Sequence, residues 1–182
     1  MVWETLSSKY LFTDNWLTLR ADTCRRNDGT IISPYYVYEF PEWVTAVPVT
    51  QEGKIIMVRQ YRHALGEICI EIPGGCMDAS DADAEAACAR ELLEETGYRF
   101  TRFTPLCITS ANPSTHNNRM HVFLATGGIK VQDQQLDSGE EIEVLQYTLD
   151  EVKQLLRERK IMQSMHVTAL FYALQQLGAI NL

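Results

Sequence analysis

The sequence lacks the segments that direct a chain into or across a membrane. No apolar run approaches the roughly 20 residues needed to span a bilayer. The stretch MVWETLSSKYLF has no basic start followed by an apolar run, unlike a secretory signal. The five cysteines are odd in number, contain no CxxC pair and show no spacing typical of zinc. These absences predict a cytoplasmic protein with reduced thiols and no membrane partner.

Positive charge is also scarce. The chain has 16 Lys and Arg against 24 Asp and Glu, a net charge of −8. Nucleic-acid binding needs a basic stripe to meet the phosphates, so we expect no nucleic-acid partner. An acidic protein that handles anionic substrates needs metal ions or a few well-placed arginines. At 182 residues and 46% hydrophobic content, the chain suits one domain with a sizeable core and an appended arm.

The hydrophobic pattern predicts strands and helices without strict βαβ alternation. Residues 1–42 are expected to form an arm of aromatic, β-branched strands with a turn at Asn27-Asp28-Gly29. Further strands are expected at 43–49, 55–60, 67–72, 106–109, 120–125 and 142–147. One helix should end at Gly97, another should begin with the capping box at Thr148, and a third should cover about 164–177. This order favours an α/β sandwich with a mixed sheet.

Residues 74–97 contain a concentrated group of carboxylates. A Gly-Gly pair follows a hydrophobic strand, and the next helix carries Glu91, Glu94 and Glu95. Residues at i, i+3 and i+4 project from one side of a helix, so these three side chains repel one another. Hard divalent cations such as Mg²⁺ prefer oxygen ligands and often accompany phosphates. The stretch is therefore a candidate metal site for phosphate chemistry.

The same stretch resembles the Nudix box, whose pattern is G-x5-E-x7-R-E-U-x-E-E-x-G-U, with U an aliphatic or aromatic residue. The second half of the pattern matches at Arg90, Glu91, Leu92, Glu94, Glu95, Gly97 and Tyr98. In the first half, counting back from Arg90 places Ala82 at the first glutamate, whereas counting forward from Gly75 places Asp81 there. We interpret this as one extra loop residue, with Asp81 or Asp83 in place of that glutamate.

The resemblance implies an α/β/α sandwich that cleaves a nucleoside diphosphate linked to another group. It implies that Glu91 and Glu95 are the main ligands of Mg²⁺, for which Mn²⁺ can substitute. Glu94 would be a third ligand, and the carbonyl of Gly74 would complete the coordination. Arg90 would orient these carboxylates through charge-assisted hydrogen bonds.

Features outside the box resemble the ADP-ribose and nucleoside diphosphate-sugar branch of this family. They are the stretches VRQYR at 58–62 and EIP at 71–73, and Pro113, fifteen residues beyond Tyr98. The resemblance implies Mg²⁺-dependent hydrolysis of ADP-ribose to AMP and ribose 5-phosphate. The segment EEIEV at 140–144 resembles the late loop that supplies the general base, which is Glu140 or, failing that, Glu141.

Substrate contacts are expected near the box. Arg62 and Arg59 are candidates for the diphosphate, because a guanidinium pairs with phosphate oxygens in bidentate fashion. Glu71 is a further candidate for substrate binding. Trp43 is the first candidate for stacking on the base, and Trp3 or Trp16 the next. The family relation also implies a homodimer in which residues 1–42 contribute to dimerisation and the substrate site, while 43–182 form the Nudix hydrolase domain.

Two other functions fit the same residues. The same scaffold can host hydrolysis of GDP-mannose or another sugar nucleotide, because pocket contacts decide the substrate. A different class is a Nudix-fold module that binds ADP-ribose without cleaving it. Such modules often lose a box glutamate, whereas Glu91, Glu94 and Glu95 are all present.

Overall fold

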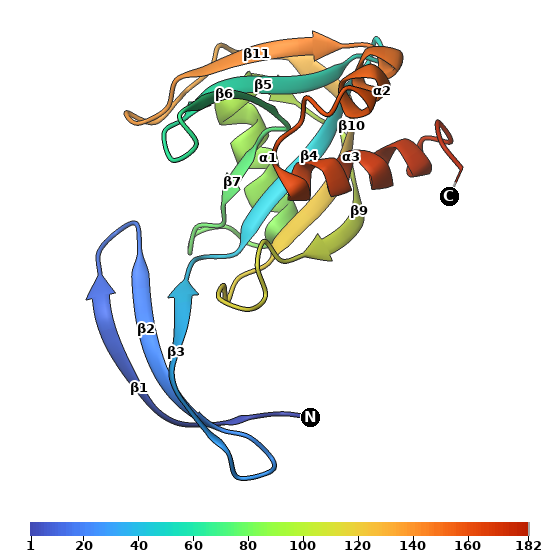
Figure 1. Cartoon of the computed structure of the whole chain (residues 1–182). Helices are drawn as coiled ribbons and strands as arrows, with labels where there is room; N and C mark the ends of the chain where they lie inside the picture. Colours follow the sequence, from blue (N-terminus) through green and yellow to red (C-terminus); the bar gives the residue numbers. More distant parts are fainter. Residues whose placement is uncertain (182) are drawn as a thin grey trace. The chain divides into compact units, whose positions relative to one another are not determined.

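The computed structural model describes residues 1–181, which form two compact units (Figure 1). The smaller unit combines Met1–Pro41 with Ser110–Arg119, and the larger unit holds Glu42–Thr109 and the chain from Met120 onward. Within the described residues, the helices are too short or too polar to cross a membrane.

The smaller unit is an antiparallel sheet in the order β1-β2-β3. Its strands are β1 (Glu4–Thr13), β2 (Thr18–Arg25) and β3 (Ile31–Glu39). Gly29 allows the turn between β2 and β3 with a φ of 85°. The loop Ser110–Arg119 joins this unit because Tyr38 on β3 donates its N–H to the carbonyl of Thr115 at 2.7 Å. The arm of strands expected from the sequence is present, although its association with this later loop was not expected.

The larger unit is built on a mixed sheet. Its strands are β4 (Trp43–Thr50), β5 (Ile55–Arg62), β6 (Glu67–Glu71), β7 (Gly74–Cys76), β8 (Tyr98–Arg99), β9 (Arg102–Thr109), β10 (Met120–Lys130) and β11 (Ile142–Tyr147). The main path runs β11-β5-β4-β10-β8, with β6 on β5, β7 on β4 and β9 on β10. The pairing of β4 with β10 is parallel and the other pairings are antiparallel, which makes the sheet mixed.

Helices cover both faces of this sheet, and the α/β/α expectation is confirmed. Helix α1 (Ala84–Thr96) packs its Cys88 and Leu92 into one buried cluster with alternating residues such as Val44. Helices α2 (Leu149–Arg157) and α3 (Ser164–Gln176) pack into a second cluster with Val47 and its neighbours. Figure 1 shows α1 and α3 on opposite sides of β4 and β10.

The helix ends follow the signals in the sequence. Gly97 caps α1 in the left-handed conformation, and an added Cβ there would lie 2.2 Å from the carbonyl oxygen of Gln132. Thr148 and Glu151 form the expected capping box of α2. That helix ends at Arg157, and the chain leaves the helical conformation at Arg159, whose φ is 56°.

Candidate functional site

The Gly-Gly turn before α1 leaves no room for side chains. An added Cβ at Gly74 would lie 2.2 Å from the carbonyl oxygen of Val44, and one at Gly75 would lie 2.6 Å from the carboxylate of Glu91. Helix α1 therefore approaches the turn closely enough for its carboxylates to reach the turn backbone. This contact brings the middle of the helix to the turn that follows the hydrophobic strand.

Two of the three helix carboxylates meet at this turn. Glu95 is 4% exposed, and its Oε2 accepts a hydrogen bond from the N–H of Gly74 at 2.9 Å. The carboxylate of Glu91 lies beside Gly75. Glu94 is more exposed and forms an ion pair with Arg90 at 3.0 Å. The turn thus gathers Glu91 and Glu95, while Glu94 lies toward solvent.

Arg90 ties the helix to the loop before it. Its Nη1 donates to Glu91 Oε1 and to Glu94 Oε2, each at 3.0 Å. Its Nε and Nη2 donate to the two carboxylate oxygens of Asp81 at 3.1 and 3.0 Å, and Nη2 also reaches the carbonyl of Cys76. Hydrogen bonding to Asp81 raises the pKa of Arg90 and lowers that of Asp81. The guanidinium is thereby fixed on both sides.

The two aspartates proposed for the missing loop glutamate have different contacts. Asp81 binds Arg90 and also accepts a hydrogen bond from the N–H of Asp78 at 2.8 Å. Asp83 is the N-cap of α1 and accepts from the N–H of Ala86. Of the two aspartates, Asp81 is therefore the one that links the loop to Arg90.

Burial disfavours the charged forms of the Glu91 and Glu95 side chains. It raises the pKa of Glu91 to about 7, partly offset by Arg90, and the pKa of Glu95 to about 8, partly offset by the N–H of Gly74. The negative charge of Glu140 adds to both increases. Carboxylates whose charged form is disfavoured by burial suit a hard divalent cation, because the cation would stabilise that charged form. Among residues 1–181, no group of three or more His, Cys, Asp or Glu side chains is arranged so that it could hold a metal ion.

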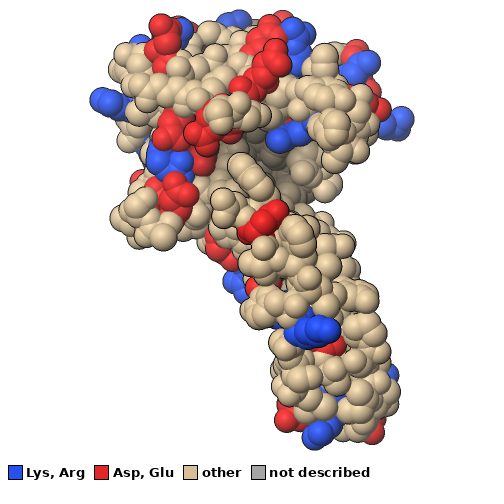
Figure 2. All heavy atoms as spheres, turned by 90° about the vertical axis from the view of Figure 1, so that its left-hand side faces the viewer, with Lys and Arg blue, Asp and Glu red and all other residues tan. Residues whose placement is uncertain are grey.

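Glu140, in the acidic loop before β11, interacts electrostatically with Glu91 and Glu95. That residue is exposed, and its Oε2 accepts a hydrogen bond from the N–H of Asp137 at 3.1 Å. Glu141 follows it and is also exposed, immediately before β11. Figure 2 shows Asp and Glu side chains gathered in a band on the face of the larger unit that is turned to the left in Figure 1.

Arg62 is bound to a buried carboxylate. Its Nε and Nη2 donate to Glu71 Oε1 and Oε2 at 2.9 and 2.5 Å, and Glu71 is 3% exposed. Glu71 therefore lies behind Arg62 and fixes the direction of the guanidinium. Arg59 instead forms an ion pair with Glu143, and about half of each of those side chains is exposed.

The three tryptophans have different surroundings. Trp43, at the start of β4, is partly buried and packs against the core cluster of α2 and α3. In the smaller unit, Trp3 contacts Tyr35 edge to face, with ring centroids 6.0 Å apart. Trp16 is 87% exposed. Core packing is thus part of the environment of Trp43, whereas Trp16 presents its ring to solvent.

His166 on α3 is a site neighbour that sequence patterns did not indicate. It is 6% exposed, and its Nδ1 lies 3.9 Å from Glu71 Oε2 without a hydrogen-bond partner among the described residues. Burial lowers the pKa of His166 to about 4, opposed by the charge of Glu71. The neutral ring therefore borders the Glu71–Arg62 pair.

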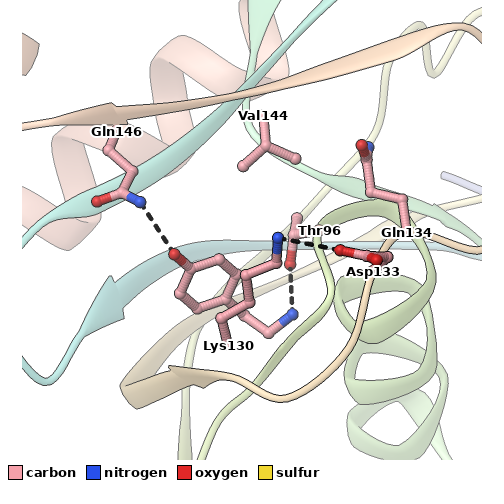
Figure 3. Close-up of a pocket in the computed structure, with 7 residues that line it drawn as sticks. Thr96, Lys130, Asp133, Gln134, Val144 and Gln146 are labelled. Atoms are coloured by element: carbon pink, nitrogen blue, oxygen red, sulfur yellow. Dashed lines mark hydrogen bonds and ion pairs between the residues drawn. The ribbon is translucent and has the colours of Figure 1, made fainter.

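A cavity of about 470 Å³ lies at the C-terminal end of α1 (Figure 3). Its lining residues are Thr96, Tyr98, Lys130, Asp133, Gln134, Val144 and Gln146. On one side of the cavity, Gln146 donates a hydrogen bond to the hydroxyl of Tyr98 at 2.9 Å. Neither Glu91 nor Glu95 lines this cavity, so it is separate from the acidic pair.

Comparison with known proteins gives two adjoining family matches. Residues 3–38 match the family described as "Nucleoside diphosphate sugar hydrolase N-terminal domain". Residues 40–167 match the "NUDIX domain". The two matches meet at the beginning of the larger unit and together cover most of the chain.

Similar proteins extend over nearly the whole chain. A "Methanol dehydrogenase activator" of Bacillus methanolicus is 30% identical over 170 residues, covering 93% of this chain and 91% of that protein. An "ADP-ribose pyrophosphatase" of Bacillus subtilis (strain 168) is 29% identical with the same coverage. A crystal structure of an "ADP compounds hydrolase" has a TM-score of 0.84 at 21% identity, covering 99% of this chain and 98% of that one, which supports the fold.

The burial of His166 predicts a specific loss of stability in acid. In the unfolded chain, the side chain of His166 binds a proton near pH 6.5. In the folded protein, the same side chain does so only near pH 4. The contribution of the neutral His166 to the free energy of unfolding is complete above pH 6.5. As the pH falls toward 4, this contribution is lost, and the free energy of unfolding decreases by roughly 2–3 kcal/mol. Urea unfolding at several pH values should show a weaker acid dependence for His166→Gln than for the wild type. The exposed His63 gives a matched control, His63→Gln, which should keep the wild-type slope. Parallel slopes for all three proteins would contradict this assignment.

Proposed function

The chain belongs to the Nudix hydrolase family, in its ADP-ribose and nucleoside diphosphate-sugar branch, and we propose that it hydrolyses ADP-ribose to AMP and ribose 5-phosphate. The observation that carries this proposal is the pair of carboxylates held at the Gly-Gly turn, the partly buried Glu91 and the buried Glu95, within reach of the charge of Glu140. A diphosphate with its cations would relieve the repulsion that this pair otherwise maintains.

In this proposal, Glu91 and Glu95 hold Mg²⁺, with Glu94 as the third carboxylate and the carbonyl of Gly74 as a further ligand. Mn²⁺ can take the same oxygen ligands. When bound, the cation neutralises the negative charge of the diphosphate. Arg90 keeps the ligands oriented, because it binds Glu91 and Glu94 while Asp81 holds its other edge.

Glu140 is the proposed general base. It accepts the proton of the water that attacks phosphorus, a step worth about 10²–10⁴-fold in rate. Its position is supported by its electrostatic effect on both Glu91 and Glu95. Glu141 is the second choice, because it adjoins Glu140 and is also exposed.

Arg62 is the proposed phosphate-binding residue, with Glu71 as its support. The Nε and Nη2 groups are engaged by Glu71, which leaves Nη1 to donate toward the substrate. Arg59 is a weaker candidate because it is paired with Glu143. For the base we propose stacking on Trp43, with Trp3 or Trp16 as the alternatives.

We also propose that the enzyme is a cytoplasmic homodimer that uses its N-terminal arm, residues 1–42, for association. Large apolar side chains of β1 are exposed, including Tyr10, Leu11 and Phe12, each more than 40% accessible. A partner surface would cover them. The five cysteines are free in the structure, which supports a reducing compartment. Residues 43–182 would carry the hydrolase domain.

A substrate panel tests the function together with the metal site. With Mg²⁺, the purified protein should release AMP from ADP-ribose faster than it cleaves GDP-mannose or nucleoside triphosphates. Glu95→Gln should lower kcat by roughly 10³-fold, because it removes a charged metal ligand from a buried site. Glu85→Gln changes an exposed glutamate in the first turn of the same helix and should keep wild-type activity.

Each alternative function has its own outcome in that panel. Faster turnover of GDP-mannose would replace ADP-ribose as the substrate. Binding of ADP-ribose without release of AMP would indicate a non-catalytic module. Wild-type rates in Glu95→Gln would contradict the metal assignment.

The identity of the base can be tested by comparing two neighbouring residues. Glu140→Gln should lower kcat by about 10²–10⁴-fold and remove the acid limb of the pH–rate profile. Glu141→Gln should change kcat by less than about threefold, since it alters the same charge one residue away from the proposed base. The reverse order of effects would assign the role to Glu141, and near-normal rates in both would remove the late loop from the mechanism.

A further inference from the structure

The segment that follows β10 crosses the C-terminal end of α1. The N–H of Gln135 donates to the carbonyl of Glu94 at 2.8 Å, and the N–H of Val131 donates to that of Gly97 at 2.9 Å. An added Cβ at Gly97 would lie only 2.2 Å from the carbonyl oxygen of Gln132. The last carbonyls of the helix, which have no partner within the helix, are therefore satisfied by this crossing segment.

Gln134 adds a side-chain contact to this crossing. Its Nε2 donates to the carbonyl of Glu95 at 2.6 Å and to the carbonyl of Ile142 at 3.1 Å. A glutamine amide nitrogen carries two hydrogens, so it can serve both acceptors at once. Figure 3 shows Gln134 at the wall of the cavity, beside the ribbon of α1.

The two carbonyls belong to the two halves of the proposed catalytic site. Glu95 provides one carbonyl, and its own side chain binds the turn at Gly74. Ile142 begins β11 and lies two residues after Glu140. Within the acidic loop, the contacts between Asp137 and Glu140 are local and hold the turn together without fixing it to α1. The Gln134 amide supplies a direct connection from α1 to the end of that loop.

We propose that Gln134 is a positioning residue, which holds the Glu140–Glu141 loop at a fixed distance from the Glu91–Glu95 pair. The expected effect on catalysis rests on the proposed function. The expected effect on the position of the loop rests on the two hydrogen bonds of Gln134. An error of about 1 Å in the position of a catalytic group can cost roughly 10²-fold in rate. A single amide that sets this distance therefore affects turnover without touching the substrate.

The sharpest variant is Gln134→Glu, because the two side chains have the same length and nearly the same shape. The glutamate has only acceptor oxygens when ionised, so it would face two carbonyls without a donor. The matched control is Gln135→Glu, which adds the same charge at the next residue. The exposed side chain of Gln135 makes no hydrogen bond among the described residues, and its backbone bond to Glu94 is retained.

Steady-state kinetics with ADP-ribose and saturating Mg²⁺ should separate the two variants. We expect Gln134→Glu to lower kcat by roughly 10- to 100-fold, with KM within about threefold of wild type, because the base is displaced and the substrate contacts remain. Gln135→Glu should stay within about twofold of wild type in both constants. Equal kinetics for the two variants would overturn the proposal.

Hydrogen exchange gives a readout that does not depend on activity. Peptides covering residues 136–142 should exchange faster in Gln134→Glu than in wild type, whereas Gln135→Glu should match wild type. Unchanged exchange in Gln134→Glu would overturn the positioning role, whatever the kinetics show. If the wild type hydrolyses no nucleoside diphosphate sugar, the proposed function fails, and faster exchange would still support the connection made by Gln134. Gln134→Met, which removes both donors at similar length, repeats the comparison if the glutamate variant does not fold.

Discussion

The close contact of α1 with the Gly-Gly turn is the constraint on which the rest of the site depends. Gly75 has no side chain, so the carboxylate of Glu91 can lie where a Cβ would be, and the N–H of Gly74 binds Glu95. The result is one partly buried and one buried carboxyl group, with pKa values of about 7 and 8 because burial disfavours their charged forms. Such an arrangement costs folding free energy in the metal-free chain. In the proposed hydrolysis, the oxygens of these two side chains are the ligands of a divalent cation.

Polar contacts at both ends of α1 maintain this geometry. At the loop side, Arg90 binds both Asp81 and Glu91, so it links the loop to the carboxylates. At the C-terminal side, Gln134 connects the backbone of Glu95 with the start of β11. Each contact is individually modest, since a hydrogen bond to a charged group contributes about 1.5–3 kcal/mol and a neutral one less. These contacts are important because they orient the side chains of the site. A metal ligand or a base is effective only within a narrow range of positions.

Much of this fold can be predicted from the sequence, because the patterns that determine its strands and helices involve residues close together in the chain. The alternating strands, the Gly97 helix end and the Thr148 capping box depend on neighbouring residues, and the structure contains them as expected. The contacts that define the site are less local. Arg62 is held by Glu71 through the pairing of β5 with β6, and His166 meets Glu71 from a helix far along the chain. Gln134 shows the same limit, because one glutamine in a turn-rich segment carries no periodic signal. The choice between Asp81 and Asp83 likewise required the folded position of Arg90.

Metal binding by a Gly75→Ala variant tests the central claim most directly. The added methyl group would meet the carboxylate of Glu91, the movable end of a side chain, so the fold should survive while the ligand is displaced. Electron paramagnetic resonance titration with Mn²⁺ should show binding to the wild type and an affinity at least about tenfold weaker in the variant. Circular dichroism should give matching spectra for the two proteins. Equal Mn²⁺ affinity in both would contradict the account, because the cation would then not depend on the position of the Glu91 carboxylate at the turn.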